Sequence, residues 1–244
     1  MLNITDKLIS KNRPFRKLVS LKAIIIHWTA NTNKGANALA NARYFNSDQY
    51  LTKSNGKKVK ISASAHYVVD DKNIIRCIPD DEVGYHVGSS SGYKELVYTK
   101  IGVPRGSSPN NYTLGIEMCV NSDSDFVKTR QNTIELTLDL LTKHQLTTAN
   151  VYRHHDITGK DCPKMMLDET VWQAFLSEIE NYNVNAVKLR VNTNELNVRT
   201  GSGTNFPIKR KLKQDDIVTK IGQSGLWYRI GDDEWIHSNY VIMV

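Results

Sequence analysis

Short apolar runs alternate with stretches of helical period over the first three quarters of the chain. Apolar runs of strand length predict buried β-strands at residues 23–27, 65–69, 73–78, 112–120 and 151–153. Helices are predicted near residues 37–50 and around two sets of apolar side chains at helical spacing, namely Ile134, Leu138 and Leu141, and Val171, Phe175 and Ile179. Both sets are expected to face the core. The alternation predicts an α/β domain with helices packed on a mixed central sheet.

The pattern changes near residue 181, where the helical period stops and asparagine becomes frequent. This change predicts a linker at residues 182–187, between a first domain over residues 1–181 and a second over residues 188–244. The second segment contains short alternating strands separated by glycine-containing turns, which is typical of a small all-β domain.

Four large aromatic residues lie in this second segment, at Trp227, Tyr228, Trp235 and Tyr240. A domain of this size has few other large apolar side chains with which to build a core. We therefore expect at least two of the four to be core residues.

Residues 152–163 (YRHHDITGKDCP) place imidazole, ammonium and thiol groups in one short segment, which is typical of half of a metal site. His27, at the end of an apolar strand, is expected to supply the other half. The gap between His154 and Cys162 is longer than ligand spacings in zinc fingers, but a turn with the intervening glycine and the following proline can bring both ends to one point. Two imidazoles and one thiolate leave a tetrahedral zinc ion one open position, as catalytic zinc requires.

Five segments, in order, resemble the zinc-dependent N-acetylmuramoyl-L-alanine amidases of phage endolysins and bacterial autolysins, which are related to peptidoglycan-recognition proteins. The segments are residues 25–29 (IIHWT), 64–70 (SAHYVVD), 84–88 (GYHVG), 114–117 (LGIE) and 154–163 (HHDITGKDCP). The resemblance covers most of residues 1–182. It implies that His27, His154 and Cys162 hold one catalytic zinc ion, and that His155 is a neighbour of the site and not a ligand.

The resemblance also implies catalytic roles for Glu117 and Lys160. Amide hydrolysis needs a nucleophile at neutral pH, stabilisation of the carbonyl oxygen and a proton for the leaving amine. Zinc can activate water and polarise the carbonyl. We expect Glu117 to pass the proton of the water to the leaving nitrogen and Lys160 to stabilise the oxyanion. The alternative for Glu117 is that it orients His154 as a hydrogen-bond partner.

Four further residues belong to segments that border the cleft in the family. Trp28 and Thr29 follow His27 and are expected to line the substrate groove. His66 and His86 have no ligand role in the family, so they are expected either to contact substrate or to support the fold.

The second segment resembles a bacterial SH3 domain over nearly its whole length. The resemblance rests on residues 196–203 (LNVRTGSG), 225–228 (GLWY) and 235–240 (WIHSNY). It implies a small SH3-like barrel, and such domains typically bind cell-wall peptides or polymers. We expect this half to attach the protein to the wall, because it contains no visible zinc or acid–base set.

Three cysteines at wide spacing do not suggest a disulfide framework, and they fit synthesis in a reducing compartment. Cys77 and Cys119 lie in apolar, strand-like contexts and are expected to be buried without a function of their own. No apolar stretch approaches membrane-spanning length, and the first twenty residues lack the apolar core of a secretory signal. The expectation is cytoplasmic synthesis without a signal peptide and action on the wall after release, through a holin or lysis.

The formal net charge is +7 at pH 7. Residues 188–244 contain 9 basic and 6 acidic residues, so the charge is spread over both halves. A positive charge favours approach to an anionic surface such as a Gram-positive wall with its teichoic acids, and salt weakens that attraction. Binding to nucleic acid is not expected because no supporting motif is present. Nothing in the sequence indicates an oligomer, so a monomer is assumed.

Two functions of different classes follow from the resemblance. One is an amidase that cuts between N-acetylmuramic acid and L-alanine of Gram-positive peptidoglycan, and the other is a receptor that binds peptidoglycan without cutting it. Family members that only bind typically lack the cysteine ligand, whereas Cys162 is present here, which favours the amidase. An endopeptidase acting within the stem peptide shares the zinc chemistry but not the family motifs.

Overall fold

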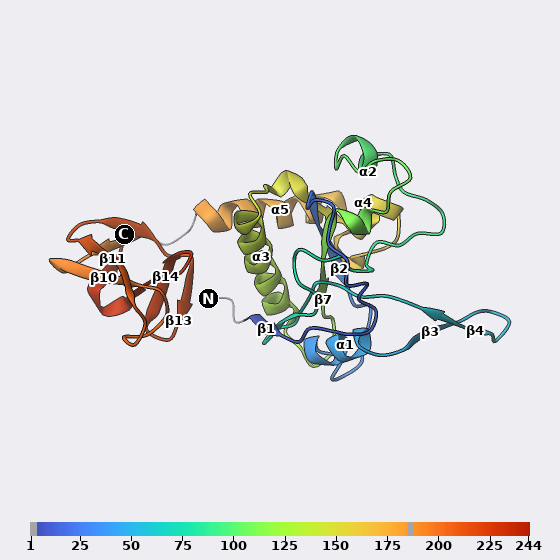
Figure 1. Cartoon of the computed structure of the whole chain (residues 1–244), viewed down its shortest axis with the longest axis horizontal. Coiled ribbons are helices and arrows are strands. Elements are labelled where there is room, and N and C mark those ends of the chain that lie inside the picture. The colour runs from blue at the N-terminus through green and yellow to red at the C-terminus, as the bar shows by residue number, and fades with distance from the viewer. Residues whose placement is uncertain (1–3, 185–187) are drawn as a thin grey trace. The chain divides into compact units, whose positions relative to one another are not determined.

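The computed structural model describes residues 4–184 and 188–244 (Figure 1). The chain divides into two compact units, the first ending at Glu180 and the second beginning at Asn181. The last helix of the first unit, α5 (Glu169–Val184), runs into the predicted linker at residues 182–187, of which the last three lie outside the described residues. Among the described helices, none combines the length and the apolar character needed to cross a membrane.

A six-stranded mixed sheet, in the order β1-β6-β5-β7-β2-β8, forms the centre of the first unit. Its strands are β1 (Ile4–Asp6), β2 (Ala23–Trp28), β5 (Tyr67–Val69), β6 (Ile74–Arg76), β7 (Thr113–Met118) and β8 (Val151–Arg153). Only the β5–β6 pair is antiparallel in this sheet. The predicted α/β class and all five predicted strands are confirmed. β1 was not predicted, because three residues at the end of a chain give no apolar run.

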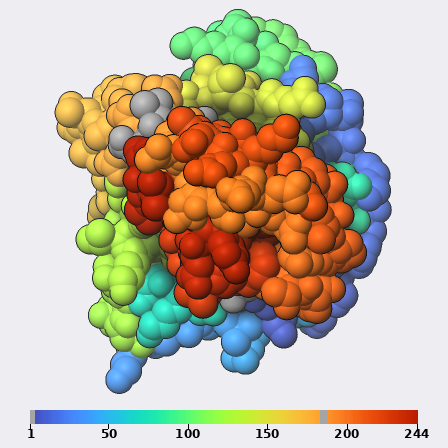
Figure 2. All heavy atoms as spheres, turned by 90° about the vertical axis from the view of Figure 1, so that its left-hand side faces the viewer, coloured from blue at the N-terminus to red at the C-terminus, as the bar shows by residue number. Residues whose placement is uncertain are grey.

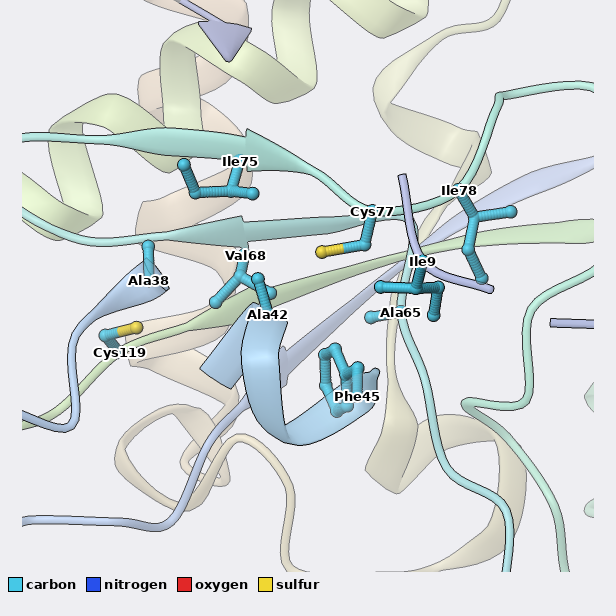
Figure 3. Packing of buried hydrophobic residues seen from close by; sticks show 10 residues of the cluster. All are labelled: Ile9, Ala38, Ala42, Phe45, Ala65, Val68, Ile75, Cys77, Ile78 and Cys119. Atoms are coloured by element: carbon cyan, nitrogen blue, oxygen red, sulfur yellow. The ribbon is translucent and has the colours of Figure 1, made fainter. Parts of the chain in front are cut away.

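The helices of the first unit are α1 (Ala38–Phe45), α2 (Leu96–Thr99), α3 (Phe126–Lys143), α4 (His154–Thr158) and α5, with 3₁₀ turns at η1 (Pro109–Asn111), η2 (Thr148–Asn150) and η3 (Lys164–Met166). Val68 of β5 lies in one buried cluster with Phe45 of α1, as Figure 3 shows. The hydroxyl of the preceding Tyr67 donates to Asp80, which also pairs with Lys143 at the end of α3. Successive strand residues point to opposite faces, so α1 and α3 cover opposite faces of the sheet.

Two details differ from the predicted helices. On α5 the buried residues are Trp172, Phe175 and Ile179, whereas Val171 is 42% exposed. The prediction for Val171 was wrong because the much larger Trp172 completes the same i, i+3, i+7 stripe and takes the place against the core. On α3 Ile134 and Leu141 are buried and Leu138 is half-buried.

The helix predicted near residues 37–50 begins at Ala38, where the Asn37 side chain accepts a hydrogen bond from Ala40 N, and ends at Phe45. A separate two-stranded hairpin follows, formed by β3 (Gln49–Thr52) and β4 (Lys58–Ile61). Its turn includes Gly56 at φ +78°, a conformation that glycine adopts without strain.

The second unit is all-β, as predicted. Its strands are β9 (Lys188–Val191), β10 (Glu195–Arg199), β11 (Ile208–Lys213), β12 (Ile217–Thr219), β13 (Gly222–Ser224), β14 (Trp227–Gly231), β15 (Glu234–His237) and β16 (Val241–Met243), with the 3₁₀ turn η4 (Ser238–Tyr240). They form a five-stranded sheet in the order β11-β10-β15-β14-β13 and a three-stranded sheet in the order β12-β9-β16. In Figure 2 the atoms of this unit, coloured orange to red, form one body.

The core of the second unit consists of aliphatic side chains, Leu189, Val191, Leu196, Val198, Leu212, Ile236 and Val241. Trp235 is buried, and Tyr228 packs against this core. Trp235 therefore lies in the interior, and the partly buried Tyr228 packs against it from the edge of the core, which agrees in part with the prediction. Trp227 is partly exposed and Tyr240 is 49% exposed, so these two are available at the surface.

Candidate active site

Three adjacent parallel strands, β7, β2 and β8, end at the same edge of the central sheet. His27 is the second-last residue of β2, Glu117 the second-last of β7, and His154 directly follows β8. Carboxyl ends of parallel strands commonly form binding sites, because loops leave the sheet there. The fold thus gathers three titratable side chains that lie far apart in the sequence.

His27 and Glu117 are register partners on β2 and β7. Paired residues on neighbouring strands point to the same face of a sheet. This face also carries the buried cluster that contains Ile25, Val87 and Ile157, so the site lies above a packed apolar floor.

The donor atoms of His27, His154 and Cys162 all lie within 4.8 Å of one another. Nδ1 of His27 is 3.1 Å from Nδ1 of His154 and 3.6 Å from Sγ of Cys162. All three side chains are buried. Two imidazole nitrogens and one sulfur converging on a point form a donor set that suits zinc.

The segment between His154 and Cys162 folds back on itself. Helix α4 ends at Thr158 and is capped by Gly159, which has φ +82°, a left-handed conformation in which glycine is favoured. The next residues turn so that Cys162 faces His27. The predicted turn therefore brings both ends of the segment to one point.

Burial keeps the ligand side chains uncharged in the absence of a cation. It lowers the pKa of His154 to about 4 and that of His27 well below its ordinary value, with neighbouring positive charge acting in the same direction. Burial also raises the pKa of the Cys162 thiol to about 12, and the nearby Glu117 carboxylate adds to this effect. Neutral imidazoles can bind a metal directly, whereas the thiol must release its proton.

Glu117 and Lys160 both lie beside the donor set. Burial raises the pKa of Glu117 to about 8, and the positive charge of Lys160 acts in the opposite direction. The Lys160 side chain is exposed, and its charge also reaches His27 and His154. Glu117 Oε2 and His154 Nε2 are buried without a hydrogen-bond partner among the described residues. Two such unsatisfied atoms beside one donor set are typical of a site that takes a ligand.

Trp28, the last residue of β2, and Thr29, which follows it, are each partly exposed. The backbone N–H of Thr29 donates to Met118 O at 3.0 Å, and its Oγ1 is buried without a partner among the described residues. Both residues therefore lie next to His27 at the carboxyl end of β2, and their contact with substrate stays a prediction.

His66 and His86 are both buried. Nδ1 of His66 accepts from Gly115 N and its Nε2 contacts Glu82 O, so both ring nitrogens bond to the backbone. Nδ1 of His86 is 3.1 Å from Nε2 of His27. These positions favour a supporting role over contact with substrate for both residues.

Arg153 is a residue of the site region that sequence reasoning missed. Its guanidinium is buried, pairs with Asp156 and Glu169, and donates to the carbonyl oxygen of Met166. It thereby joins the start of α4, and so His154, to the segment that precedes α5. The one signal for this role in the sequence was the position of Arg153 between a predicted strand and His154, a proposed metal ligand.

Comparison with known proteins agrees with this geometry. A family model described as N-acetylmuramoyl-L-alanine amidase matches residues 17–165, more than half of the chain. The chain belongs to this family. A second model, described as a bacterial SH3 domain, matches residues 194–242. The resemblance of both halves is therefore confirmed.

Relatives of this amidase family occur in Bacillus. N-acetylmuramoyl-L-alanine amidase XlyA of Bacillus subtilis (strain 168) is 34% identical over 182 residues, which are 73% of this chain and 52% of the relative. CwlL of Bacillus licheniformis is 30% identical over 229 residues, 92% of this chain and 56% of the relative. The chain thus spans about half the length of the curated relatives it matches. The solved catalytic domain of XlyA has a TM-score of 0.57 at 31% identity, and the match covers 72% of this chain and 99% of that domain.

Proposed function

We propose that the protein is a zinc-dependent N-acetylmuramoyl-L-alanine amidase that hydrolyses the amide bond between N-acetylmuramic acid and the L-alanine of the stem peptide. The observation that carries the proposal is the convergence of His27, His154 and Cys162 beside Glu117. Membership of the amidase family and the names of its relatives support the same reaction.

His27, His154 and Cys162 would hold the zinc ion, since their donor atoms already face one another. When bound, zinc polarises the carbonyl group and lowers the pKa of water to about 7, which makes a nucleophile available at neutral pH. The unpartnered Glu117 Oε2 and His154 Nε2 support a ligand-binding site here. The three protein ligands leave the open position that catalysis needs.

Glu117 is suited to accept the proton of the attacking water and deliver it to the leaving amine nitrogen. Its Oε2 has no hydrogen-bond partner among the described residues, and burial raises its pKa, so that the ionised carboxylate is a stronger base than an exposed one, while the positive charge of Lys160 favours that ionised form. The same observation disfavours the alternative that Glu117 orients His154, because no hydrogen bond joins Oε2 to Nε2 of that ring. Lys160 supplies a fixed positive charge for the carbonyl oxygen as negative charge develops on it.

Hydrolysis is favoured over a receptor function by Cys162. A protein that only binds muropeptide has no need of a buried thiol aimed at two buried imidazoles, and burial of such a set is unfavourable without a ligand to complete it. An endopeptidase would share the zinc chemistry. However, the matching family and the relatives named above are described as N-acetylmuramoyl-L-alanine amidases.

The SH3-like unit is proposed to hold the protein on the Gram-positive cell wall. A groove on this unit is lined by Glu195, Leu196, Asn197, Arg199, Thr204, Trp227, His237 and Tyr240. The Trp227 and His237 rings meet edge to face at 5.1 Å, and Tyr240 adjoins His237. Aromatic faces flanked by one basic and one acidic residue suit the peptides of peptidoglycan, which carry both charges. We propose that the protein acts as a monomer on the wall after release from the cell.

Digestion of purified Gram-positive peptidoglycan tests the reaction. The zinc-loaded protein should release stem peptides that begin with L-alanine and leave the glycan strands intact, as mass spectrometry would record. A Cys162→Ser variant, checked for bound metal, should release neither. Binding to the wall without any released fragment would favour the receptor, and cleavage inside the stem would favour the endopeptidase.

A further inference from the structure

His86 is a buried histidine that contacts a proposed metal ligand without belonging to the donor set. Its Nδ1 is 3.1 Å from Nε2 of His27, and its Nε2 is 3.2 Å from the carbonyl oxygen of Thr113. We propose that His86 is a positioning residue that fixes the tautomer of His27, so that the His27 Nδ1 lone pair faces the metal. This inference rests on the proposed metal centre for its purpose, but the tautomer can be tested without metal.

The direction of each hydrogen bond follows from the two oxygens next to His86 Nε2. The carbonyl oxygen of Thr113 can only accept. The Thr113 hydroxyl is also 3.2 Å from Nε2, but it donates its one hydrogen to Pro109 O at 3.0 Å and so can only accept from the ring. His86 therefore carries a hydrogen on Nε2.

A neutral imidazole with hydrogen on Nε2 has a lone pair on Nδ1. The Nδ1 of His86 must then accept from His27, which places the hydrogen of His27 on Nε2 and its lone pair on Nδ1. That lone pair is directed at the point shared with His154 and Cys162. The His86 ring packs edge to face against His27 and His66 and bonds to Thr113, none of which carries a negative charge. A doubly protonated His86 would be a buried cation without a carboxylate in contact, which is costly.

The sheet and the neighbouring loop fix the His86 ring in this place. A Cβ atom at Gly115 of β7 would lie 2.7 Å from both Cγ and Nδ1 of the ring, so only glycine leaves room for it. The backbone N–H groups of His86 and Val87 both donate to Oδ1 of the buried Asn110, at 3.1 and 3.0 Å. The position of the ring is thus fixed by backbone hydrogen bonds to Asn110, by close packing against Gly115 and by hydrogen bonds at both ring nitrogens. Such hydrogen-bonded partners commonly orient metal-binding histidines.

His66 provides a matched control within the same interior. It is even more deeply buried than His86, and its ring adjoins that of His86 with centroids 5.6 Å apart. Its ring nitrogens bond to the backbone of Gly115 and Glu82 instead of to a ligand. Loss of His66 is therefore expected to lower stability without changing the tautomer of His27.

The test uses the full chain with ¹⁵N-labelled histidine. In the metal-free wild-type protein at neutral pH, NMR should find the hydrogen of His27 on Nε2, and zinc should then shift the Nδ1 resonance. In His86→Ala the single tautomer should be lost, and zinc affinity from chelator competition should fall about 10- to 100-fold. His86→Asn keeps an acceptor near the Nδ1 position and should restore most of the affinity, whereas His66→Asn should leave the zinc affinity unchanged.

A wild-type His27 with its hydrogen on Nδ1 would overturn the inference, and this result does not depend on whether any variant folds. A folded His86→Ala protein with wild-type zinc affinity would also overturn it. If the wild-type protein has the hydrogen of His27 on Nε2 but does not bind zinc, the result would count against the proposed metal centre. It would still support the hydrogen bonds from His27 to His86 and from His86 to Thr113. A protein that binds zinc as expected but releases no stem peptide would count against the proposed reaction alone.

Discussion

The backbone N–H of His155 donates to the carbonyl oxygen of Cys162, with the two atoms 2.8 Å apart. This bond closes the loop that starts after α4 and ends at the third proposed ligand. Lys160 lies within the closed loop, and its own carbonyl oxygen accepts from Cys162 N at 2.7 Å. The position of the Lys160 backbone is thus tied to that of the ligand, although its side chain is exposed.

Replacement of Lys160 by alanine is expected to lower kcat by about 10²- to 10³-fold, the usual loss when a group that stabilises an oxyanion is removed. KM should change little, because charge develops on the carbonyl oxygen only in the transition state. Steady-state assays on a soluble muropeptide would measure both constants. Lys160→Arg retains the charge and serves as the control, and full activity of Lys160→Ala would remove this residue from the mechanism.

Glu117→Gln keeps the shape of the side chain but cannot accept a proton. We expect it to bind one zinc ion like the wild-type protein and to lose about 10²- to 10⁴-fold in kcat, the range for a general base. Metal content by elemental analysis and turnover of the same muropeptide would be compared. Zinc-loaded Glu117→Gln with wild-type turnover would exclude the base role.

The stability of the metal-free protein should depend on pH through its buried histidines. Burial lowers the pKa of His66 from 6.5 to about 4, so the unfolded state binds the extra proton between these pH values. The His66 contribution is therefore complete above pH 6.5 and is lost as pH falls toward 4, by about 3 kcal/mol at 1.36 kcal/mol per pKa unit.

Urea unfolding of the chelator-treated protein at a series of pH values checks this dependence. The free energy of unfolding of His66→Gln should fall less steeply than that of the wild-type protein as pH is lowered from 6.5 to 4, by an amount that corresponds to at most one proton. Above pH 7 the two proteins should show the same dependence on pH. An identical dependence on pH in both proteins across the acid range would show that folding does not lower the pKa of His66.

The groove on the SH3-like unit gives a separate prediction about attachment. Trp227→Ala should weaken binding to purified cell walls at least tenfold, because a partly exposed aromatic residue in a groove is typical of a dominant binding contact. Co-sedimentation in a Cys162→Ser background measures binding without digestion. Ile242→Ala, an exposed position on β16 outside the groove, is the control, and equal binding by all three proteins would place the contact elsewhere.

Substitutions at the neighbouring residues Val171 and Trp172 are expected to differ greatly in their effect on stability. Trp172→Ala should lower the free energy of unfolding by about 3–5 kcal/mol, because the side chain is buried and stacks on Phe175 with ring centroids 5.4 Å apart. Val171→Ala should change it by less than about 0.5 kcal/mol, since the side chain is 42% exposed. Denaturant unfolding of both variants would check the pair, and a large effect at Val171 would contradict the position of α5.

The sequence was sufficient to predict those features that depend on local patterns. Apolar runs predicted the strands, and the place of His27 at the end of one of them predicted its position at the edge of the sheet. The α5 stripe was assigned to Val171 because spacing alone fits residues 171 and 172 equally well, and only side-chain size separates them.

The contact between His86 and His27 could not be predicted in this way. His86 lies in a loop without periodicity, and its ring position depends on Gly115 and Thr113, which are far away in the sequence. The hairpin at β3 and β4 was missed for another reason. Its strands are only four residues long, and residues 37–50 were assigned to one helix, so the short alternation of lysine with apolar residues in β4 was not taken as a strand.

The hydrogen bonds that run from His27 through His86 end on the carbonyl oxygen of Thr113, which belongs to the main chain. Substitution at position 113 does not delete this acceptor as long as β7 forms, although it would alter the hydroxyl contact. Gly115, two residues along the same strand, has the opposite character, because even one added methyl group would meet the His86 ring. In a library of single substitutions we therefore expect the buried position 113 to accept small residues such as serine and valine, and position 115 to accept glycine alone, although neither residue touches the metal ligands.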